Sequence, residues 1–270
     1  MHDLSDVTRL PDDFDGRVRL FPLPGLVLFP HAMQPLHIFE PRYCELLLES
    51  LKGDRLIAMA TLNGPGPGTP AAGNPVAGAP LPADAGIADG GTGPAIDPIV
   101  CIGKIISHAE LEDDRHNILL VGAQRARVRH ELDAGRPFRI GEVDVLPDIY
   151  SPAGAQRRRK LKQELLDAFA AIVPATTGAK KSLHELMAGQ MGLGPITDII
   201  AYTLPFEIDD KLRLLAESDV DDRAQDLVEL LRSGRIELSS VSVEEQSLGP
   251  FETGEGTPRE PGFPPPFSLN

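Results

Sequence analysis

The sequence has few cysteines, no long apolar run and a deficit of positive charge, and each of these excludes a class of protein. Its two cysteines, Cys44 and Cys101, match no CxxC or zinc-binding spacing, so we expect no disulfide framework and favour a reducing, cytoplasmic location. No window approaches the ~18 apolar residues of a membrane helix, and the polar start lacks the pattern of a secretory signal, so no membrane partner is expected. Lys and Arg number 26 against 40 Asp and Glu, and this balance disfavours nucleic acid as a partner.

The composition that remains is that of a folded protein, with 41% hydrophobic and 24% charged residues. It divides the chain into an acidic leader (1–16), a β-rich subdomain (17–150), a helical subdomain (155–240) and a Pro/Gly/Glu tail (245–270) that we expect to be disordered. An insertion over 63–98 has Gly or Pro at 17 of 36 positions and no Lys or Arg. Such a long loop is rare inside a compact domain, so we interpret it as a disordered extension of a strand-to-strand connection.

The periodicity predicts an α+β fold. Short apolar runs on both sides of the insertion, followed by alternating segments at 118–132 and 138–148, favour a small antiparallel β-barrel. In the first alternating segment Arg125, Arg127 and Arg129 share one face, which we interpret as the solvated face of a half-buried strand. Further along, an apolar stripe at steps of three and four predicts a helix near residue 160, consisting of Leu161, Leu165, Phe169 and Ile172.

The stretch from Leu20 to Tyr43 combines strongly apolar residues with five prolines. Pro24-Gly25 suits a type II turn, and LVLF (26–29) reads as a short buried strand that ends at Pro30. Pro41 suits the first position of a helix, RYCELLLESLK, which Gly53 closes. We therefore interpret this stretch as core, with prolines placed where elements end.

A search for catalytic chemistry finds no residues to assign. The segment Gly178–Ser182 fails the phosphate-loop pattern, and Ser151–Gly154 is not a nucleophile elbow. His37 and Glu40 form HxxE with His31 nearby, but the surrounding prolines predict extended chain, where the two side chains point to opposite faces. The sequence thus predicts no catalytic residue, no metal site and no cofactor. The basic run Arg157–Lys160 reads as a solvated helix start, with a basic docking patch as the alternative.

The sequence LFPLPGLVLFPHAMQPLHIFEPRYCELLLESLKGDRLIAMATL closely resembles the opening of the N-terminal, substrate-recognising domain of the ATP-dependent protease Lon. Two later segments resemble the same family, GKIISHAELEDDRHNILLVGAQRARV and the helical region from Gly194 onward. The resemblance covers about residues 17–235. It implies a PUA-like β-barrel subdomain followed by a helical subdomain, and a Lon-domain protein that stands alone, without the ATPase and the Ser–Lys peptidase.

The resemblance also implies a function, a non-catalytic module that binds exposed polypeptide segments or a protein partner. We expect contacts in a groove between barrel and helices, with candidate residues Phe29, Met33, Phe39 and Tyr43. Core packing is the competing interpretation for the aromatic residues. Two further alternatives stay open, an accessory subunit that acts with a separate ATPase and peptidase, and weak self-association.

Overall fold

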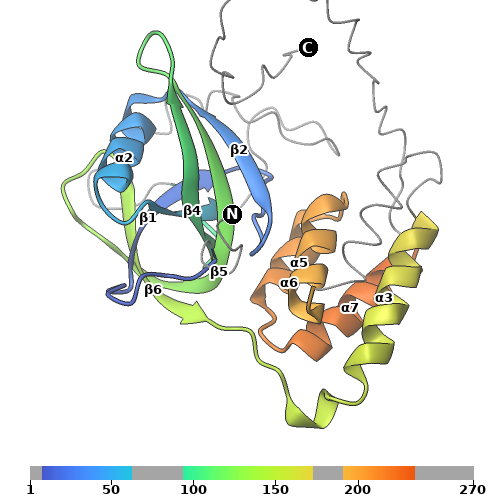
Figure 1. Ribbon diagram of the computed structural model, residues 1–270. Coiled ribbons are helices and arrows are strands. Elements are labelled where there is room, and N and C mark those ends of the chain that lie inside the picture. The colour runs from blue at the N-terminus through green and yellow to red at the C-terminus, as the bar shows by residue number, and fades with distance from the viewer. Residues whose placement is uncertain (1–7, 63–93, 173–190, 235–270) are drawn as a thin grey trace, which may run out of the picture.

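The computed structural model describes residues 8–62, 94–172 and 191–234 (Figure 1). Six strands are present in these ranges, most of them where apolar runs predicted strands. Their bounds are β1 (Arg17–Leu23), β2 (Met33–Ile38), β3 (Leu56–Thr61), β4 (Ile99–Glu110), β5 (His116–Leu132) and β6 (Arg139–Leu146).

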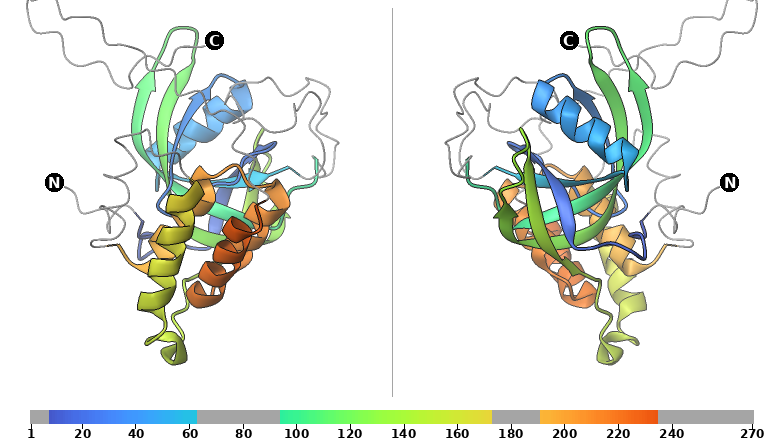
Figure 2. Two further views of the ribbon diagram at one scale, coloured as in Figure 1. Left: turned by 90° about the vertical axis from the view of Figure 1, so that its right-hand side faces the viewer. Right: turned by 90° about the vertical axis from the view of Figure 1, so that its left-hand side faces the viewer.

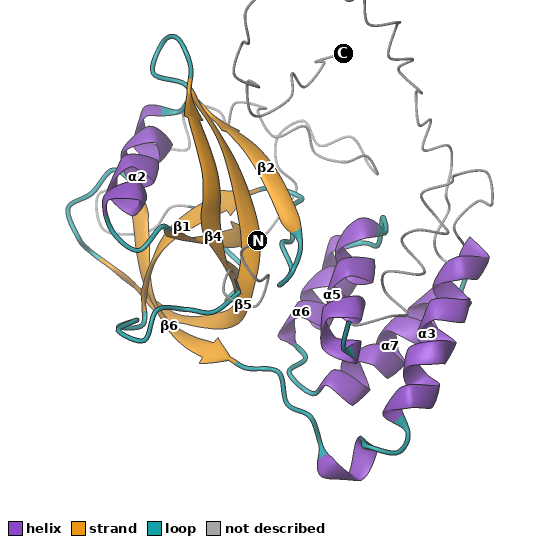
Figure 3. Cartoon of the chain, viewed as in Figure 1, coloured by secondary structure: helices purple, strands orange, loops and turns teal. Residues whose placement is uncertain are grey.

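The strands form one sheet in the order β2-β5-β4-β3-β1-β6 (Figure 3). Because β6 pairs with β5 as well as with β1, the pairings of five strands close into a circuit, with β2 added beside β5. The prediction of an antiparallel sheet is wrong at one place, because β1 pairs with β3 in parallel. Parallel neighbours need a crossover connection. Here β2 and helix α2 (Pro41–Lys52) supply that connection, so the sheet is mixed.

The proline-rich opening stretch is largely as predicted. Gly25 has a φ of +68° in the turn after β1, and Pro41 occupies the first turn of α2. The prediction of a strand at residues 26–29 is wrong. Val27, Leu28 and Phe29 are buried but have no regular secondary structure. Pro22 and Pro35 lie inside β1 and β2 rather than at corners.

The remaining helices gather on one side of the molecule and lie below the strands in both side views (Figure 2). They are α3 (Arg158–Ile172), α5 (Leu193–Thr203), α6 (Ile208–Ala216) and α7 (Val220–Arg232), with a short 3-10 turn at Pro152–Gly154. The predicted stripe of α3 is confirmed, since Leu161, Leu165 and Phe169 are buried. Helix α2 lies apart from this group, against the strands (Figure 1).

The main core runs without a break from the strands into the helices. A second, smaller cluster around Leu20 and Ile102 is covered in part by Leu10 and Phe14, which belong to the predicted leader. Most of the predicted insertion and all of the predicted tail lie outside the described residues. No helix among the described residues is long and apolar enough to cross a membrane.

Candidate functional site

Four charged side chains meet where the helical group joins the sheet, and all but the partly exposed Asp148 are buried. Arg125 of β5 donates to Asp148 Oδ1 at 2.9 Å and to the carboxylate of Asp198 on α5. Arg223 of α7 donates to both oxygens of Asp148, at 2.9 and 3.0 Å, and to Thr197 Oγ1 at 3.2 Å. We call Arg125, Asp148, Asp198 and Arg223 the junction network, because it joins a strand, two helices and the segment after β6.

Because the junction network is mostly buried, its charged groups depend on one another for pairing. The Arg125 side chain is 2% exposed, and burial alone would lower its pKa, but the nearby carboxylates of Asp198 and Asp148 outweigh that effect and raise it. Two buried atoms, Arg125 Nε and Asp198 Oδ2, have no hydrogen-bond partner among the described residues. The network therefore depends on its ion pairs, and losing either carboxylate would leave a guanidinium poorly paired.

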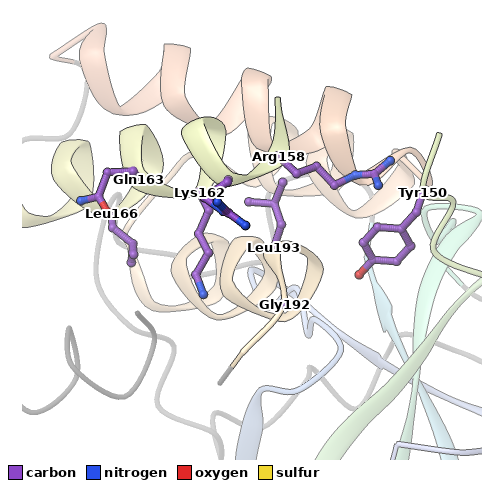
Figure 4. Close-up of a pocket in the computed structure, with 8 residues that line it drawn as sticks. Tyr150, Arg158, Lys162, Gln163, Leu166, Gly192 and Leu193 are labelled. Carbon is purple, nitrogen blue, oxygen red and sulfur yellow. The ribbon is translucent and has the colours of Figure 1, made fainter. Parts of the chain in front are cut away.

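Next to the junction network lies an open groove of about 540 Å³ (Figure 4). One wall is the first half of α3 and the other is the start of α5, and the groove is lined by Tyr150, Arg158, Arg159, Lys162, Gln163, Leu166, Gly192 and Leu193. Leu166 and Leu193 are almost fully buried, whereas the Tyr150 side chain is half-exposed. We call this feature the α3–α5 groove.

The segment between β6 and α3 holds Tyr150 at the mouth of the α3–α5 groove. Tyr150 comes two residues after Asp148, and Ile149 forms backbone hydrogen bonds with Ser218 and Val220 next to α7. A methyl group at Gly194 would lie 2.5 Å from Asp148 Oδ2 and 2.7 Å from the Tyr150 hydroxyl. A side chain at this position would therefore displace the ends of Asp148 and Tyr150.

The cations of the groove differ in how they are neutralised. Arg158 is bidentate to Asp221, at 2.7 and 2.9 Å, and its guanidinium lies 5.2 Å from the centre of the Tyr150 ring. Lys162 donates to the carbonyl oxygen of Met191 at 2.8 Å. Arg159 is exposed and makes no ion pair with any residue in the described ranges. None of the described lining residues is acidic.

The four residues proposed from the sequence do not meet at one place. Phe29 is completely buried, and Tyr43 is buried with its ring stacked on Phe21 at 4.3 Å, where burial raises its pKa to about 12. Phe39 is partly exposed, and Met33 is 59% exposed. Met33 and Phe39 lie at opposite ends of β2, about 20 Å apart for six extended residues. None of the four lines the α3–α5 groove.

Met33 nevertheless lies where sheet and helices meet. The Tyr202 hydroxyl, at the end of α5, donates to Gln34 Oε1 at 2.6 Å and contacts the Met33 carbonyl oxygen at 3.2 Å. Since β2 pairs only with β5 among the described strands, it is an edge strand, and Pro35 and the Tyr202 contact limit pairing along that edge. The exposed Met33 side chain thus sits on a fixed backbone.

One arginine prediction is wrong. Arg127 and Arg129 are exposed as predicted, but Arg125 is buried in the junction network. In the HxxE pattern, His37 Nδ1 bonds Asn117 Oδ1 at 2.7 Å, and the described residues contain no group of three or more His, Cys, Asp or Glu side chains placed to hold a metal ion. Sequence reasoning missed the roles of Asp148, Asp198 and Arg223, for which no local pattern gives a signal.

Comparison with solved structures defines the class of fold. The chain is similar to the N-terminal domain of Lon protease from the Mycobacterium avium complex, with a TM-score of 0.56 and 12% identity over 81% of this chain and 99% of that one. The protein is therefore an α+β domain with the fold of a Lon N-terminal domain. The family follows from the sequence: residues 17–233 match the model of the ATP-dependent protease La (LON) substrate-binding domain, and the chain belongs to that family.

Curated relatives agree with this assignment at low sequence identity. The chain is 21% identical over 220 residues to Lon protease of Cytophaga hutchinsonii and 24% identical over 213 residues to Lon protease of Heliobacterium modesticaldum. These alignments cover 82% and 78% of this chain but 24% and 23% of the relatives. The chain thus spans about a quarter of the length of the curated relatives it matches.

Proposed function

We propose that this chain is a non-catalytic module that binds exposed polypeptide segments. The observation that carries the proposal is the family match, which extends over residues 17–233 and so takes in both the strands and the helices. The closed circuit of strands also supports the PUA-like barrel that the sequence resemblance implies. Proteolysis, which the names of the longer relatives state, is not part of this proposal.

Of the residues proposed as contacts, Met33 and Phe39 reach the surface in this conformation. Phe29 and Tyr43 support the backbone from within the core and would contact a ligand only after rearrangement. We therefore assign direct contact to Met33 first, because its side chain is the most exposed large apolar group among the described residues.

The absence of tryptophan from the chain allows a direct binding test. Reduced, carboxymethylated α-lactalbumin is unfolded and contains tryptophan, so its fluorescence anisotropy reports binding without background from this protein. We expect the anisotropy to rise in a saturable way with the unfolded form and not with native α-lactalbumin. Equal responses to the two forms, or no response to either, would contradict the proposal.

A variant then tests the assigned contact. Met33→Ser should weaken binding about fivefold, the loss expected when roughly 1 kcal/mol of apolar contact is removed. Ile106→Ser is the matched control, since Ile106 is also exposed but lies on β4. Equal weakening by both substitutions would remove Met33 from the binding surface.

A further inference from the structure

The α3–α5 groove has an unusual charge for this protein. The whole chain carries a net charge of −14, yet the groove is lined by Arg158, Arg159 and Lys162 and by no acidic residue in the described ranges. Asp221 already neutralises Arg158, whereas Arg159 faces solvent. Arg159 therefore offers positive charge to a ligand from outside the ion pairs of the groove.

The same groove offers apolar surface beside that charge. Most of this surface is the half-exposed ring of Tyr150, which stands at the mouth with Arg158 against the ring face, whereas Leu166 and Leu193 line the groove but are only 1% and 5% exposed (Figure 4). At about 540 Å³ its size is within the range of small ligand pockets, and it is large enough for a few side chains rather than for a folded partner.

The lining is also held in place. Tyr150 is fixed by the junction network through Asp148 and by the backbone bonds of Ile149, and Leu193 begins a helix that packs on α7. A surface whose apolar and charged groups are already positioned loses little entropy when it binds.

We infer that the α3–α5 groove selects polypeptide segments in which a carboxylate side chain stands next to an aromatic or large aliphatic one. This inference rests on the proposed function and adds a second contact surface, apart from Met33, together with the substrate class it selects. Arg159 pairs with the carboxylate, and the apolar side chain lies against the exposed ring of Tyr150.

The test uses three synthetic 12-residue peptides that share one Trp and two Leu and differ at four positions, which are all Glu, all Gln or all Lys. In 0.05 M NaCl, tryptophan anisotropy should show the Glu peptide binding about fivefold more tightly than the Gln peptide, and the Lys peptide most weakly. The preference should shrink in 0.5 M NaCl, because salt screens exposed charges. Equal affinities of the Glu and Gln peptides would overturn the inference.

Variants test which residues cause the preference for the Glu peptide. Arg159→Glu should abolish it and Arg159→Lys should retain it, whereas Tyr150→Ser should weaken the Glu and Gln peptides alike. Arg127→Glu is the matched control, since Arg127 is exposed on β5, has no ion pair within the described ranges and does not line the groove. A preference that survives Arg159→Glu, or that Arg127→Glu removes equally, would overturn the inference.

Two outcomes separate this inference from the proposed function. If unfolded α-lactalbumin binds but charge makes no difference, the inference fails and the proposed function stands. If no polypeptide binds, both fail. A single-stranded DNA 12-mer that displaces the Glu peptide in an Arg159-dependent way, and binds more tightly than it, would overturn the assignment to polypeptide.

Discussion

The interior of the sheet and its junction with the helices are held together in opposite ways. The sheet interior consists of fully buried aliphatic side chains such as Leu56, Ile102 and Leu120. At the junction, Arg125, Asp198 and Arg223 are equally buried but charged. Apolar contacts stabilise the fold without a preferred direction, whereas a buried guanidinium is stable only where a carboxylate pairs with it. The comparison indicates that the stability of the sheet interior depends on side-chain volume, whereas the stability of the junction depends on charge pairing.

The largest effect should come from removing one charge of the junction network. Asp198→Ala leaves Arg125 and Arg223 with only Asp148 between them, and we expect unfolding in urea to become easier by about 3–5 kcal/mol. Asp144→Ala is the matched control, since Asp144 pairs with Arg129 on the surface and should cost less than about 1 kcal/mol. Similar losses in the two variants would contradict the comparison.

The sheet interior should instead be sensitive to added volume. A methyl group at Gly122 would lie closer than 3.0 Å to the carbonyl group of Phe29, and that backbone cannot move aside as a side chain can. His31 and Ala32 also bond to Gly122, so the whole segment would shift. We expect Gly122→Ala to lower the free energy of unfolding by about 3 kcal/mol, measured in urea. Gly192→Ala is the control, since its φ of −70° suits alanine and a methyl group there would meet only Pro195 Cδ, at 3.7 Å.

These two regions also differ in how far the sequence predicts them. Alternation and proline placement in residues 17–62 predict strands and α2, because burial there follows a local period. Residues 26–29 are the exception to this prediction. They are apolar because they are buried, but they do not pair with a neighbouring strand. The parallel pairing of β1 with β3 has no local signature, since it depends on how the β2–α2 crossover is placed.

Arg125 illustrates why the candidate site was harder to predict than the fold. Its spacing from Arg127 and Arg129 matches an exposed face, but the helical group reaches β5 at Arg125, through Asp198 of α5, and leaves Arg127 and Arg129 exposed. The residues that make its burial tolerable, Asp148 and Asp198, lie far along the chain and in different elements. Among the residues that line the groove, the sequence indicated only those of the basic run. Tyr150 and Leu193 come to the groove through the fold.

A partly buried cation, Lys211, has no carboxylate partner among the described residues and extends the comparison through pH. Lys211 donates to the Tyr202 carbonyl at 3.1 Å, has no ion pair within the described ranges, and burial lowers its pKa from 10.5 to about 8. Between pH 8 and 10.5 the unfolded chain holds a proton that the native protein lacks, so the free energy of unfolding should rise with pH. We expect a rise on the order of 2 kcal/mol, which Lys211→Met should remove.

Urea unfolding of both proteins at several pH values between 7 and 11 gives the difference directly. Lys52→Met is the control, since Lys52 is exposed at the end of α2 and should leave the pH dependence unchanged. A slope that persists in Lys211→Met would assign the titration to other groups.

The smallest effect should come from the N-terminal cap of α7, which lies outside the junction network. Asp219 caps α7 by accepting from the backbone N–H groups of Asp221 at 2.8 Å and Asp222 at 3.3 Å. Asp219→Ala should therefore lower the free energy of unfolding by about 1 kcal/mol, whereas Asp219→Ser, which can still cap, should lose less. Because this carboxylate makes no contact with Arg125 or Arg223, its loss should add to that of Asp198→Ala. Strong non-additivity in the double variant would mean that the cap and the junction network act as one unit, and that charge pairing reaches further into the helices than the buried contacts indicate.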